Sequence, residues 1–429
     1  MKRKLFFKEC TDYCGFDNLP EGIEAFYDGF LGDTEEYLID RGFLVRLFEK
    51  YDLPQDKQDL VLKACEAIEA DQILLHFTKF LVWDMCSARN RCDADHYKNL
   101  TPVCMPKYRE LYSFLLLLAC VKPAMRQLNE RGVPAGYYED IPYRPMEKQF
   151  KKLIEHGDVS VSDFPWDMNF YTCSIFLMDR FLFIPCKFED SLTIYRNNKT
   201  GKVIALRHGG EEFRSDGQLN GINKVYDKRG KFTAEWSEGE NSVTANPISP
   251  MGYVKKEKIT LDKKEWEIAL KQGELLLALH VPAGPGYNPD RLKNSMELAI
   301  EFYDKYFPEL HIKGFWSESW LYDSRLSLIL DNDKSNIIKV QRQFYLYPVK
   351  AGDSMLRYEV FGDWNADPYK AELKTSLQKA AFDYMKTGGR FNNLSMVVLR
   401  EEVHKVGNNT YITVEDIEEF KRTVDSHLK

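Results

Sequence analysis

The segment from residue 275 to residue 303 constrains the fold more than any other part of this chain. The apolar run Leu275–Val281 predicts a buried strand. Pro282 ends that run, and a glycine-containing turn follows it. Asn288 is a good N-cap for a helix, and Pro289 takes the first helical position, where its missing N–H has no cost. The segment therefore predicts a strand, a tight turn and a helix in direct succession.

The same segment offers a place where an anion can bind. Gly284 and Gly286 allow a ligand to approach the backbone closely, because they carry no side chain. Unpaired N–H groups and the positive end of the helix dipole point toward the same region. Strand–turn–helix units also occur as plain architecture, so the pattern is compatible with a purely structural role.

Length and charge exclude several classes of function. The 429 residues are enough for two or three domains, and the net charge of -7 offers no general attraction to nucleic acid or to an anionic membrane. The longest uncharged apolar run, Leu111–Val121, is too short to span a bilayer. The basic start of the chain lacks the apolar stretch of a signal peptide. We therefore expect a cytoplasmic protein that has neither nucleic acid nor a membrane as a partner.

The cysteines predict no metal site. All of the nine cysteines precede residue 187, and their odd number and irregular spacing argue against a disulfide framework. The pairs Cys10/Cys14 and Cys86/Cys92 lack the C-x2-C spacing of a zinc site. A reducing compartment and no metal cofactor are expected.

The pattern of apolar residues changes near residue 140. Helical periodicity runs through Glu35–Tyr51, through Asp59–Cys86 as one long helix or two shorter ones, and through Pro106–Leu128. The Gly/Pro-rich stretch Gly132–Pro142 has the composition of a boundary. Residues 1–140 are therefore predicted to form a helical N-terminal domain.

Residues 141–429 mix helices with strands. Helices are expected at Pro145–His156, Phe164–Arg180, Ser324–Leu330 and Ser376–Thr387. Strands are expected at Phe181–Phe188, Ile312–Trp316, Ile337–Tyr347, Arg357–Phe361 and Met396–Leu399; two hairpins are expected, 192–207 and 232–245, and Ile259–Leu270 is read as a strand that becomes a helix. Hairpins together with a crossover indicate an α+β (mixed α/β) fold.

Several motifs in this second part resemble one protein family. They are His280-Val-Pro-Ala-Gly284, Phe307-Pro-Glu309, Gly314-Phe315, Ser319-Trp-Leu321, Tyr195–Ala205, Asn246–Gly252 and Thr375–Gln378. The run is similar to a family of bacterial acyltransferase-domain proteins, in which a helical N-terminal domain precedes a GNAT-like (N-acetyltransferase-like) domain. The resemblance covers roughly residues 145 to 400.

The resemblance implies a binding site for acyl-CoA as co-substrate. A GNAT-like enzyme holds acyl-CoA in a notch between two parallel strands, here Leu275–Val281 and Ile312–Trp316, and the loop after the first strand binds the pyrophosphate. The implied binding residues are Ala283, Gly284, Gly286, Tyr287, Asn288 and Arg291. The chain departs from the family loop, which reads Gln/Arg-x-x-Gly-x-Gly/Ala: Val281 holds the place of the first residue, Pro285 removes one N–H donor, and Asp290 adds a negative charge.

Three residues that bracket this notch are candidates for catalysis. Acyl transfer needs a base for the nucleophile, a donor for the developing oxyanion and an acid for the leaving thiolate. His280 is the preferred base or oxyanion donor, although a histidine there can also serve packing. Glu318 is a second candidate base but is expected to be an exposed carboxylate, and Tyr322 is the candidate acid or else a packed side chain.

The sequence therefore favours an enzyme that moves an acyl group from CoA to an amine or hydroxyl on a small molecule. The departures in the loop keep a second hypothesis open, a catalytically inactive GNAT-fold protein with a binding or regulatory role. Neither the acceptor, the acyl chain length, the role of the helical domain nor the oligomeric state follows from the sequence.

Overall fold

The computed structural model describes residues 5–30, 38–87, 97–157, 159, 161 and 163–427. The chain folds into two compact units. The first comprises Met1–Leu177 with Ile184–Cys186, and the second comprises Met178–Phe183 with Lys187–Lys429.

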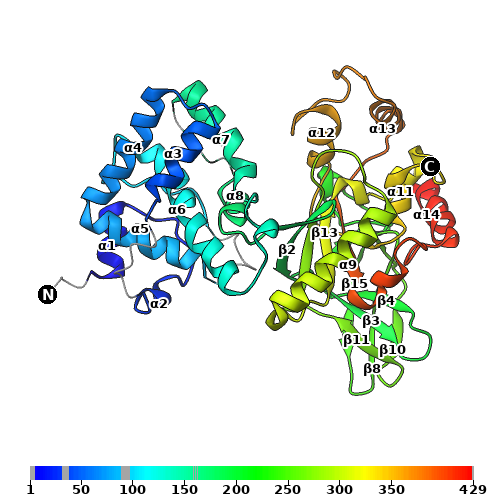
Figure 1. The fold of residues 1–429 in the computed structure, drawn as a ribbon. Helices are drawn as coiled ribbons and strands as arrows, with labels where there is room; N and C mark the ends of the chain where they lie inside the picture. The colour runs from blue at the N-terminus through cyan, green and yellow to red at the C-terminus, as the bar shows by residue number, and fades with distance from the viewer. Residues whose placement is uncertain are drawn as a thin grey trace. The chain divides into compact units, whose positions relative to one another are not determined.

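The first unit is built from helices (Figure 1). Its described helices are α1 (Phe7–Cys14), α2 (Glu24–Tyr27), α3 (Arg41–Lys50), α4 (Gln55–Ala70), α5 (Gln72–Met85), α6 (Arg109–Glu130), α7 (Tyr143–His156) and α8 (Phe164–Tyr171). The stretch predicted as one or two helices over 59–86 is two helices, because Asp71 ends α4 and its side chain accepts from the backbone N–H of Ile73 and Leu74 at the start of α5.

The centre of this unit is α6, whose residues Leu111–Val121 are all buried. Among the described residues it is the one helix that is long and apolar enough to cross a membrane, and 78% of its most apolar stretch is buried inside the protein. A helix at the centre of a bundle has the same composition, because it is covered on every side.

The helical unit extends beyond the boundary expected at residue 140. The ring of Phe150 on α7 stacks on Tyr51 at 4.8 Å and contacts the edge of Phe114 on α6 at 5.4 Å. The backbone oxygen of Tyr143 also accepts from the hydroxyl of Tyr51. The stretch 132–142 thus lies within the helical unit, and the chain first passes into the second unit after Leu177.

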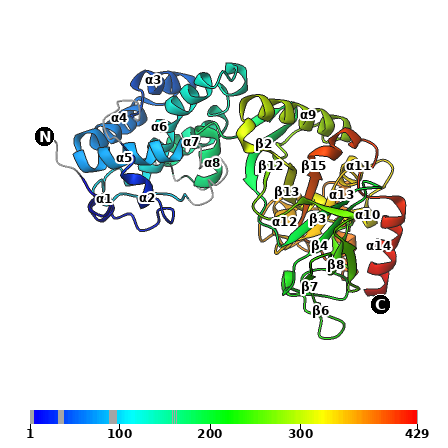
Figure 2. The same ribbon diagram turned by 90° about the horizontal axis from the view of Figure 1, so that it is seen from below.

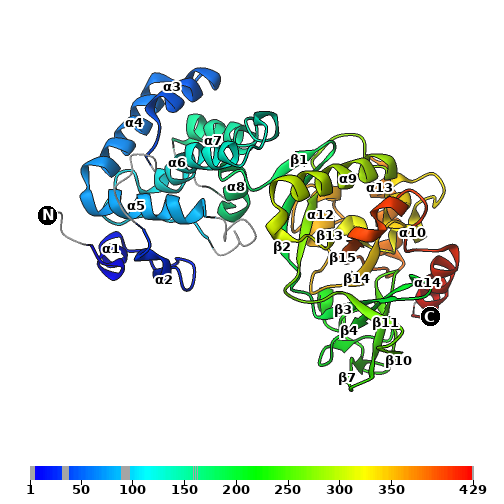
Figure 3. The ribbon, with the colours of Figure 1, turned by 60° about the horizontal axis from the view of Figure 1, so that its bottom comes forward.

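A six-stranded sheet, most of whose residues belong to the second unit, has the order β1-β2-β12-β13-β15-β14 (Figure 1). Its strands are β1 (Phe176–Met178), β2 (Phe181–Lys187), β12 (Leu275–His280), β13 (Gly314–Ser319), β14 (Tyr345–Pro348) and β15 (Leu394–Leu399). β12 and β13 are parallel, whereas β15 is antiparallel to both β13 and β14. The helix α9 (Pro289–Tyr306) connects β12 to β13 and lies along this sheet, as Figures 1 and 3 show, and the hydroxyl of Tyr303 donates to the backbone oxygen of Phe183 on β2.

A second, seven-stranded sheet is formed mainly by the hairpins (Figures 2 and 3). Its strands are β3 (Leu192–Asn197), β4 (Val203–Arg207), β7 (Trp236–Glu238), β8 (Ser242–Ser249), β9 (Tyr253–Val254), β10 (Ile259–Asp262) and β11 (Trp266–Leu270). The pairing of β3 with β4 and of β7 with β8 matches the two predicted hairpins. The prediction that residues 266–270 continue as a helix is wrong, because they pair with β3 as an edge strand.

The remaining helices of the second unit flank these sheets. They are α10 (Leu326–Ile329), α11 (Asn336–Gln341), α12 (Ser354–Phe361), α13 (Ser376–Lys386) and α14 (Val414–His427). Two stretches predicted as strands, the first half of 337–347 and 357–361, are helical here. The helix predicted over 164–180 ends at Tyr171, and its last part belongs to β1.

Candidate active site

The parallel strands β12 and β13 separate toward their carboxyl ends. Their pairing covers Leu277 with Phe315 and Ala278 with Trp316, whereas β12 continues to His280 and β13 to Ser319. On its other side β13 remains paired with β15 as far as Ser319. The sheet therefore opens between β12 and β13 while β13 stays in place. This opening is the notch expected from the sequence.

The side chains at the notch divide between the two faces of the sheet. Successive residues of a strand point to opposite faces. Phe315 contacts the ring of Phe183 at 5.4 Å, so it lies on the same face as that residue of β2, and Ser317 shares this face. His280 and Glu318 both lie on the opposite face, one on each side of the notch.

Arg180, in the turn between β1 and β2, fixes the loop that follows β12. Its Nε donates to the backbone oxygen of Pro285 at 2.7 Å, and its Nη2 donates to those of Pro282 at 2.6 Å and Gly284 at 2.8 Å. Three carbonyl oxygens of one short loop are thus held by one buried guanidinium. Because the carbonyls are engaged in this way, the conformation of the loop is set by a residue more than a hundred positions earlier in the chain.

The N–H groups of this loop remain available. Within the described part of the chain, the N–H groups of Ala283, Gly284, Gly286 and Tyr287 donate to no protein acceptor. Gly284 and Gly286 have φ values of 116° and 96°, which side-chain-bearing residues adopt only with strain. The loop therefore presents unpaired backbone donors directly before a helix N-terminus, as an anion site requires.

The start of α9 is formed as the sequence predicts. The side chain of Asn288 accepts from the backbone N–H of Arg291 at 3.0 Å, and Pro289 is the first helical residue. The guanidinium of Arg291 is held by Asp179 through two contacts of 2.6 Å, so the turn that carries Arg180 also anchors the first turn of the helix. Arg291, a predicted CoA-binding residue, thus has its charge balanced by a carboxylate, and nearly half of its side chain remains exposed.

Two tyrosine hydroxyls are buried near the notch without a hydrogen-bond partner, those of Tyr287 and Tyr322. The ring of Tyr287 contacts Phe181, and Tyr322 lies close to Ser317, although no well-aligned hydrogen bond joins the two hydroxyls. Burial raises the pKa of both tyrosines far above their ordinary value, so both hydroxyls stay protonated. Each is a buried donor that lacks an acceptor, which costs free energy unless a ligand supplies one.

His280 is half-buried at the end of β12. Burial lowers the pKa of its imidazole to about 4. The side chain is therefore neutral at pH 7, and its low pKa makes it a weaker base than the sequence suggested.

Glu318 is half-buried, and the expectation that it is an exposed carboxylate is wrong. Its Oε1 accepts from Nδ2 of Asn393 at 3.2 Å, and Asn393 directly precedes β15, which covers this side of β13. Burial raises the pKa of Glu318, the hydrogen bond from Asn393 opposes this, and the negative charge of Asp190 raises the pKa further. A carboxylate whose pKa is raised is a better base at neutral pH than an exposed one.

No group of three or more His, Cys, Asp or Glu side chains that could hold a metal ion is found in the described residues. The eight described cysteines are all free thiols, while Cys92 lies outside the described residues. The groups at the notch are therefore carboxylates, hydroxyls, an imidazole and backbone amides.

Two family models match the chain. Residues 42–173 match the N-acyltransferase N-terminal domain, and residues 206–397 match the GNAT-like C-terminal domain. The chain belongs to an N-acyltransferase family with a GNAT-like C-terminal domain. The α+β fold and the family resemblance predicted from the sequence are thereby confirmed.

Solved structures share this two-domain fold. One is an acyltransferase in complex with decanoyl-CoA and teicoplanin, which is 17% identical with a TM-score of 0.53 over 92% of this chain and 99% of that chain. Another is an acyltransferase mutant in complex with octanoyl-CoA, which is 17% identical with a TM-score of 0.52 over 91% of this chain and 98% of that chain. No curated protein sequence matches the chain. At this level of identity the likeness establishes the fold.

Three residues at the notch were not singled out in the sequence: Arg180, Asp190 and Asn393. Each lies in a turn or loop and reaches the notch through contacts with residues distant in the chain. No local pattern marks them, and only covariation with residues of β13 or of the loop after β12 would have pointed to them.

Proposed function

We propose that the second unit transfers an acyl group from acyl-CoA to an amine or hydroxyl acceptor, with the thioester held in the notch between β12 and β13. The observation that carries this proposal is the loop 282–288, whose carbonyls are bound by Arg180 while its N–H groups are left free. A loop organised in this way favours a phosphate group, because the donors are fixed in place before the ligand arrives.

The pyrophosphate of CoA would bind to the amides of Ala283, Gly284, Gly286 and Tyr287 at the start of α9. Pro285 contributes no donor, but its carbonyl accepts from Arg180 and helps to hold the loop. Asp290 remains an unfavourable charge near this site. Its effect is weakened because it is exposed to water.

The residues at the notch can carry out the chemical step. Glu318 takes a proton from the acceptor nitrogen or oxygen, whose lone pair forms a bond to the thioester carbonyl carbon. The C–S bond breaks, its electron pair leaves with sulfur, and the hydroxyl of Tyr322 supplies a proton to the thiolate. The proton on Glu318 then returns through solvent to the tyrosinate, which restores both groups. His280, neutral at pH 7, is placed to donate a hydrogen bond and to shape the notch rather than to act as the base.

The experiment is release of the free CoA thiol from acyl-CoA, with octanoyl-CoA and decanoyl-CoA as first donors because related folds have been seen with them. Glu318→Gln should lower kcat by about 10²- to 10⁴-fold, since it removes the base. Glu301→Gln, at an exposed position of α9, is the matched control and should retain full activity.

Two outcomes would count against the proposal. Full activity in a folded Glu318→Gln protein would remove the assigned base. Binding of CoA without turnover of any donor would favour the second hypothesis, an inactive GNAT-fold protein that binds acyl-CoA as a regulatory ligand. The free thiols of the described cysteines support our further proposal that the enzyme works in the cytoplasm.

A further inference from the structure

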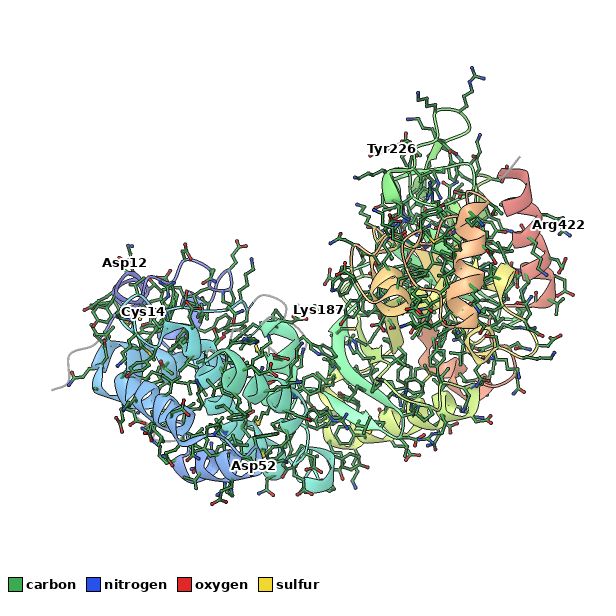
Figure 4. The ribbon with its side chains drawn as sticks, turned by 90° about the horizontal axis from the view of Figure 1, so that it is seen from above. Asp12, Cys14, Asp52, Lys187, Tyr226 and Arg422 are labelled. Atoms are coloured by element: carbon green, nitrogen blue, oxygen red, sulfur yellow. The ribbon has the colours of Figure 1, made fainter. Side chains whose placement is uncertain are left out.

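The side chain of Tyr287 has no part in the mechanism described so far, although it lies in the loop that follows β12, directly before the N-cap of α9. Its ring contacts that of Phe181, with the centroids 6.1 Å apart. Phe181 is the first residue of β2, the strand that ends at Lys187, which is labelled in Figure 4. Phe181 and Phe183 are alternate residues of β2, so Tyr287 lies on the face where Phe183 contacts Phe315.

Tyr322 reaches the same face from the other side of the notch. Ser317 shares this face with Phe315, because the two are alternate residues of β13, and Tyr322 lies close to Ser317. Tyr322 and Tyr287 are also near enough for a charge on Tyr322 to raise the pKa of Tyr287. Both hydroxyls are buried, and among the described residues neither has a hydrogen-bond partner, so they do not bond to each other. Two buried donors that lie near one another therefore both lack an acceptor.

The two hydroxyls differ in how easily they lose a proton. Burial raises the pKa of both, but the nearby hydroxyl of Ser317 lowers that of Tyr322, whereas a charge on Tyr322 raises that of Tyr287 further. When Tyr322 has lost its proton, Tyr287 therefore keeps its own. Tyr322 is suited to transfer a proton, and Tyr287 is suited to donate a hydrogen bond.

We propose that Tyr287 is a second catalytic residue on this face, whose hydroxyl donates a hydrogen bond to the sulfur of the thioester beside that of Tyr322. This inference rests on the function proposed above and deepens it. A sulfur atom between the two hydroxyls supplies the acceptor that each of them lacks. A thiolate is charged and accepts hydrogen bonds more strongly than a thioester, so the contact strengthens as the C–S bond breaks, which is what lowers a barrier.

The step is balanced in atoms and charge. The acceptor gives its proton to Glu318 as its lone pair forms the bond to the carbonyl carbon, and the C–S bond breaks with its electron pair on sulfur. Tyr322 gives its proton to the thiolate, which becomes the CoA thiol, and the hydroxyl of Tyr287 then donates to the tyrosinate. The proton on Glu318 returns through solvent to Tyr322, while Tyr287 keeps its own proton throughout.

The first test concerns the thiol of bound CoA and needs no turnover. The pKa of this thiol is measured from the ultraviolet absorbance of the thiolate during a pH titration, with the complex of desulfo-CoA, which lacks the sulfur, as the blank. Tyr287→Phe keeps the ring beside Phe181 and should raise this pKa by about 1, because the thiolate loses one donor. The affinity for desulfo-CoA should not change, since the backbone N–H of residue 287 remains.

The second test is turnover of octanoyl-CoA in the thiol-release assay. Tyr287→Phe should lower kcat roughly 10-fold, the equivalent of that change in pKa, with little change in KM. Tyr253→Phe is the matched control, because it also removes a buried hydroxyl that has no hydrogen-bond partner among the described residues. The ring of Tyr253 packs beside Phe420 of α14, and the control should behave as the wild type in both tests.

The outcomes separate the two proposals. An unchanged pKa of the bound thiol, or an unchanged kcat, in a folded Tyr287→Phe protein would overturn the role of Tyr287 and leave acyl transfer intact. An equal change in Tyr253→Phe would also overturn it. A raised thiol pKa in Tyr287→Phe, together with no turnover of any donor by the wild type, would support the contact with sulfur and count against acyl transfer. Absence of CoA binding to the wild type would overturn both.

Discussion

Replacing Arg180 by Met should loosen the loop after β12 without disrupting the sheet. Methionine keeps an apolar stem beside Gly286 but removes the guanidinium, which lies over the ring of Phe181. Its three hydrogen bonds to the backbone oxygens of Pro282, Gly284 and Pro285 are lost with it. Hydrogen bonds that involve a charged group contribute about 1.5–3 kcal/mol each, and water replaces part of this in so exposed a loop. We therefore expect the ordered loop to lose about 2 kcal/mol relative to open conformations, which corresponds to a roughly 30-fold weaker affinity for CoA.

The assay is calorimetric titration of CoA into both proteins, with thermal unfolding measured in parallel. Arg357→Met is the matched control, because Arg357 also donates to a loop carbonyl, that of Ala366, and also lies in the second unit. The control should bind CoA with the affinity of the wild type. The CoA affinity of Arg180→Lys should fall between those of Arg180→Met and the wild type, since a single ammonium can replace only part of the hydrogen bonds that the guanidinium makes.

An unchanged CoA affinity in a folded Arg180→Met protein would refute the reasoning. It would mean that the loop holds its conformation without the guanidinium, or that CoA does not bind there. A large loss of affinity in Arg357→Met would show instead that any loosening of the second unit weakens binding.

Two further predictions concern residues at the ends of this segment. Gly286→Val should lower the affinity for CoA about tenfold in the same titration, or by about 1.4 kcal/mol, because a Cβ at Gly286 would lie 3.4 Å from Cδ of Arg180. Gly284→Val has similar backbone strain, but its Cβ would meet no neighbour within 4 Å, so it should lower the affinity less. The folded state lowers the pKa of His280 to about 4, so its contribution to stability is complete above the unfolded value near 6.5 and is lost as pH falls through 4. His280→Gln should therefore reduce the loss of unfolding free energy between pH 6.5 and 4 by up to about 3 kcal/mol, seen as a smaller fall in Tm. An identical pH profile of Tm in both proteins would contradict this.

The parts of the fold with strong local signals could be predicted from the sequence. The strand β12, the turn after it and α9 are all present, because a long apolar run, two glycines and a well-placed N-cap specify them within about thirty residues. The capping box of Thr375 and Gln378 similarly marks the start of α13.

Short elements were mispredicted where tertiary contacts decide the conformation. The apolar, β-branched stretch Ile337–Val340 suggests a strand, yet it is helical and places Ile338 in a core cluster with Leu326 and Phe391. The stretch Trp266–Leu270 has helix-like spacing, but the edge of β3 offers it backbone pairing instead. The residues that decide each conformation, the core cluster around Ile338 and the strand β3, are too far away in the sequence for a local pattern to reveal them.

The burial of Glu318 could not be predicted for the same reason. The residues that cover it and tune it, Asn393 and Asp190, are supplied by segments 75 positions later and well over a hundred positions earlier in the chain. The sequence analysis preferred His280 to Glu318 as the base. Burial in the folded sheet lowers the pKa of His280 and raises that of Glu318, and no local pattern predicts this burial.

The mechanism proposed above assigns the two proton transfers of acyl transfer to opposite faces of the sheet. Glu318 lies on one face of the sheet with Asp190, and its raised pKa suits it to accept a proton. Ser317, the preceding residue of β13, points to the other face, where Tyr322 and Tyr287 carry protonated, buried hydroxyls. Because β13 runs between them, the base cannot be neutralised directly by the acid, as it would be if both groups shared one pocket. In the proposed mechanism the acceptor therefore approaches from the carboxylate face, and the thiolate leaves toward the face where the protonated hydroxyls lie.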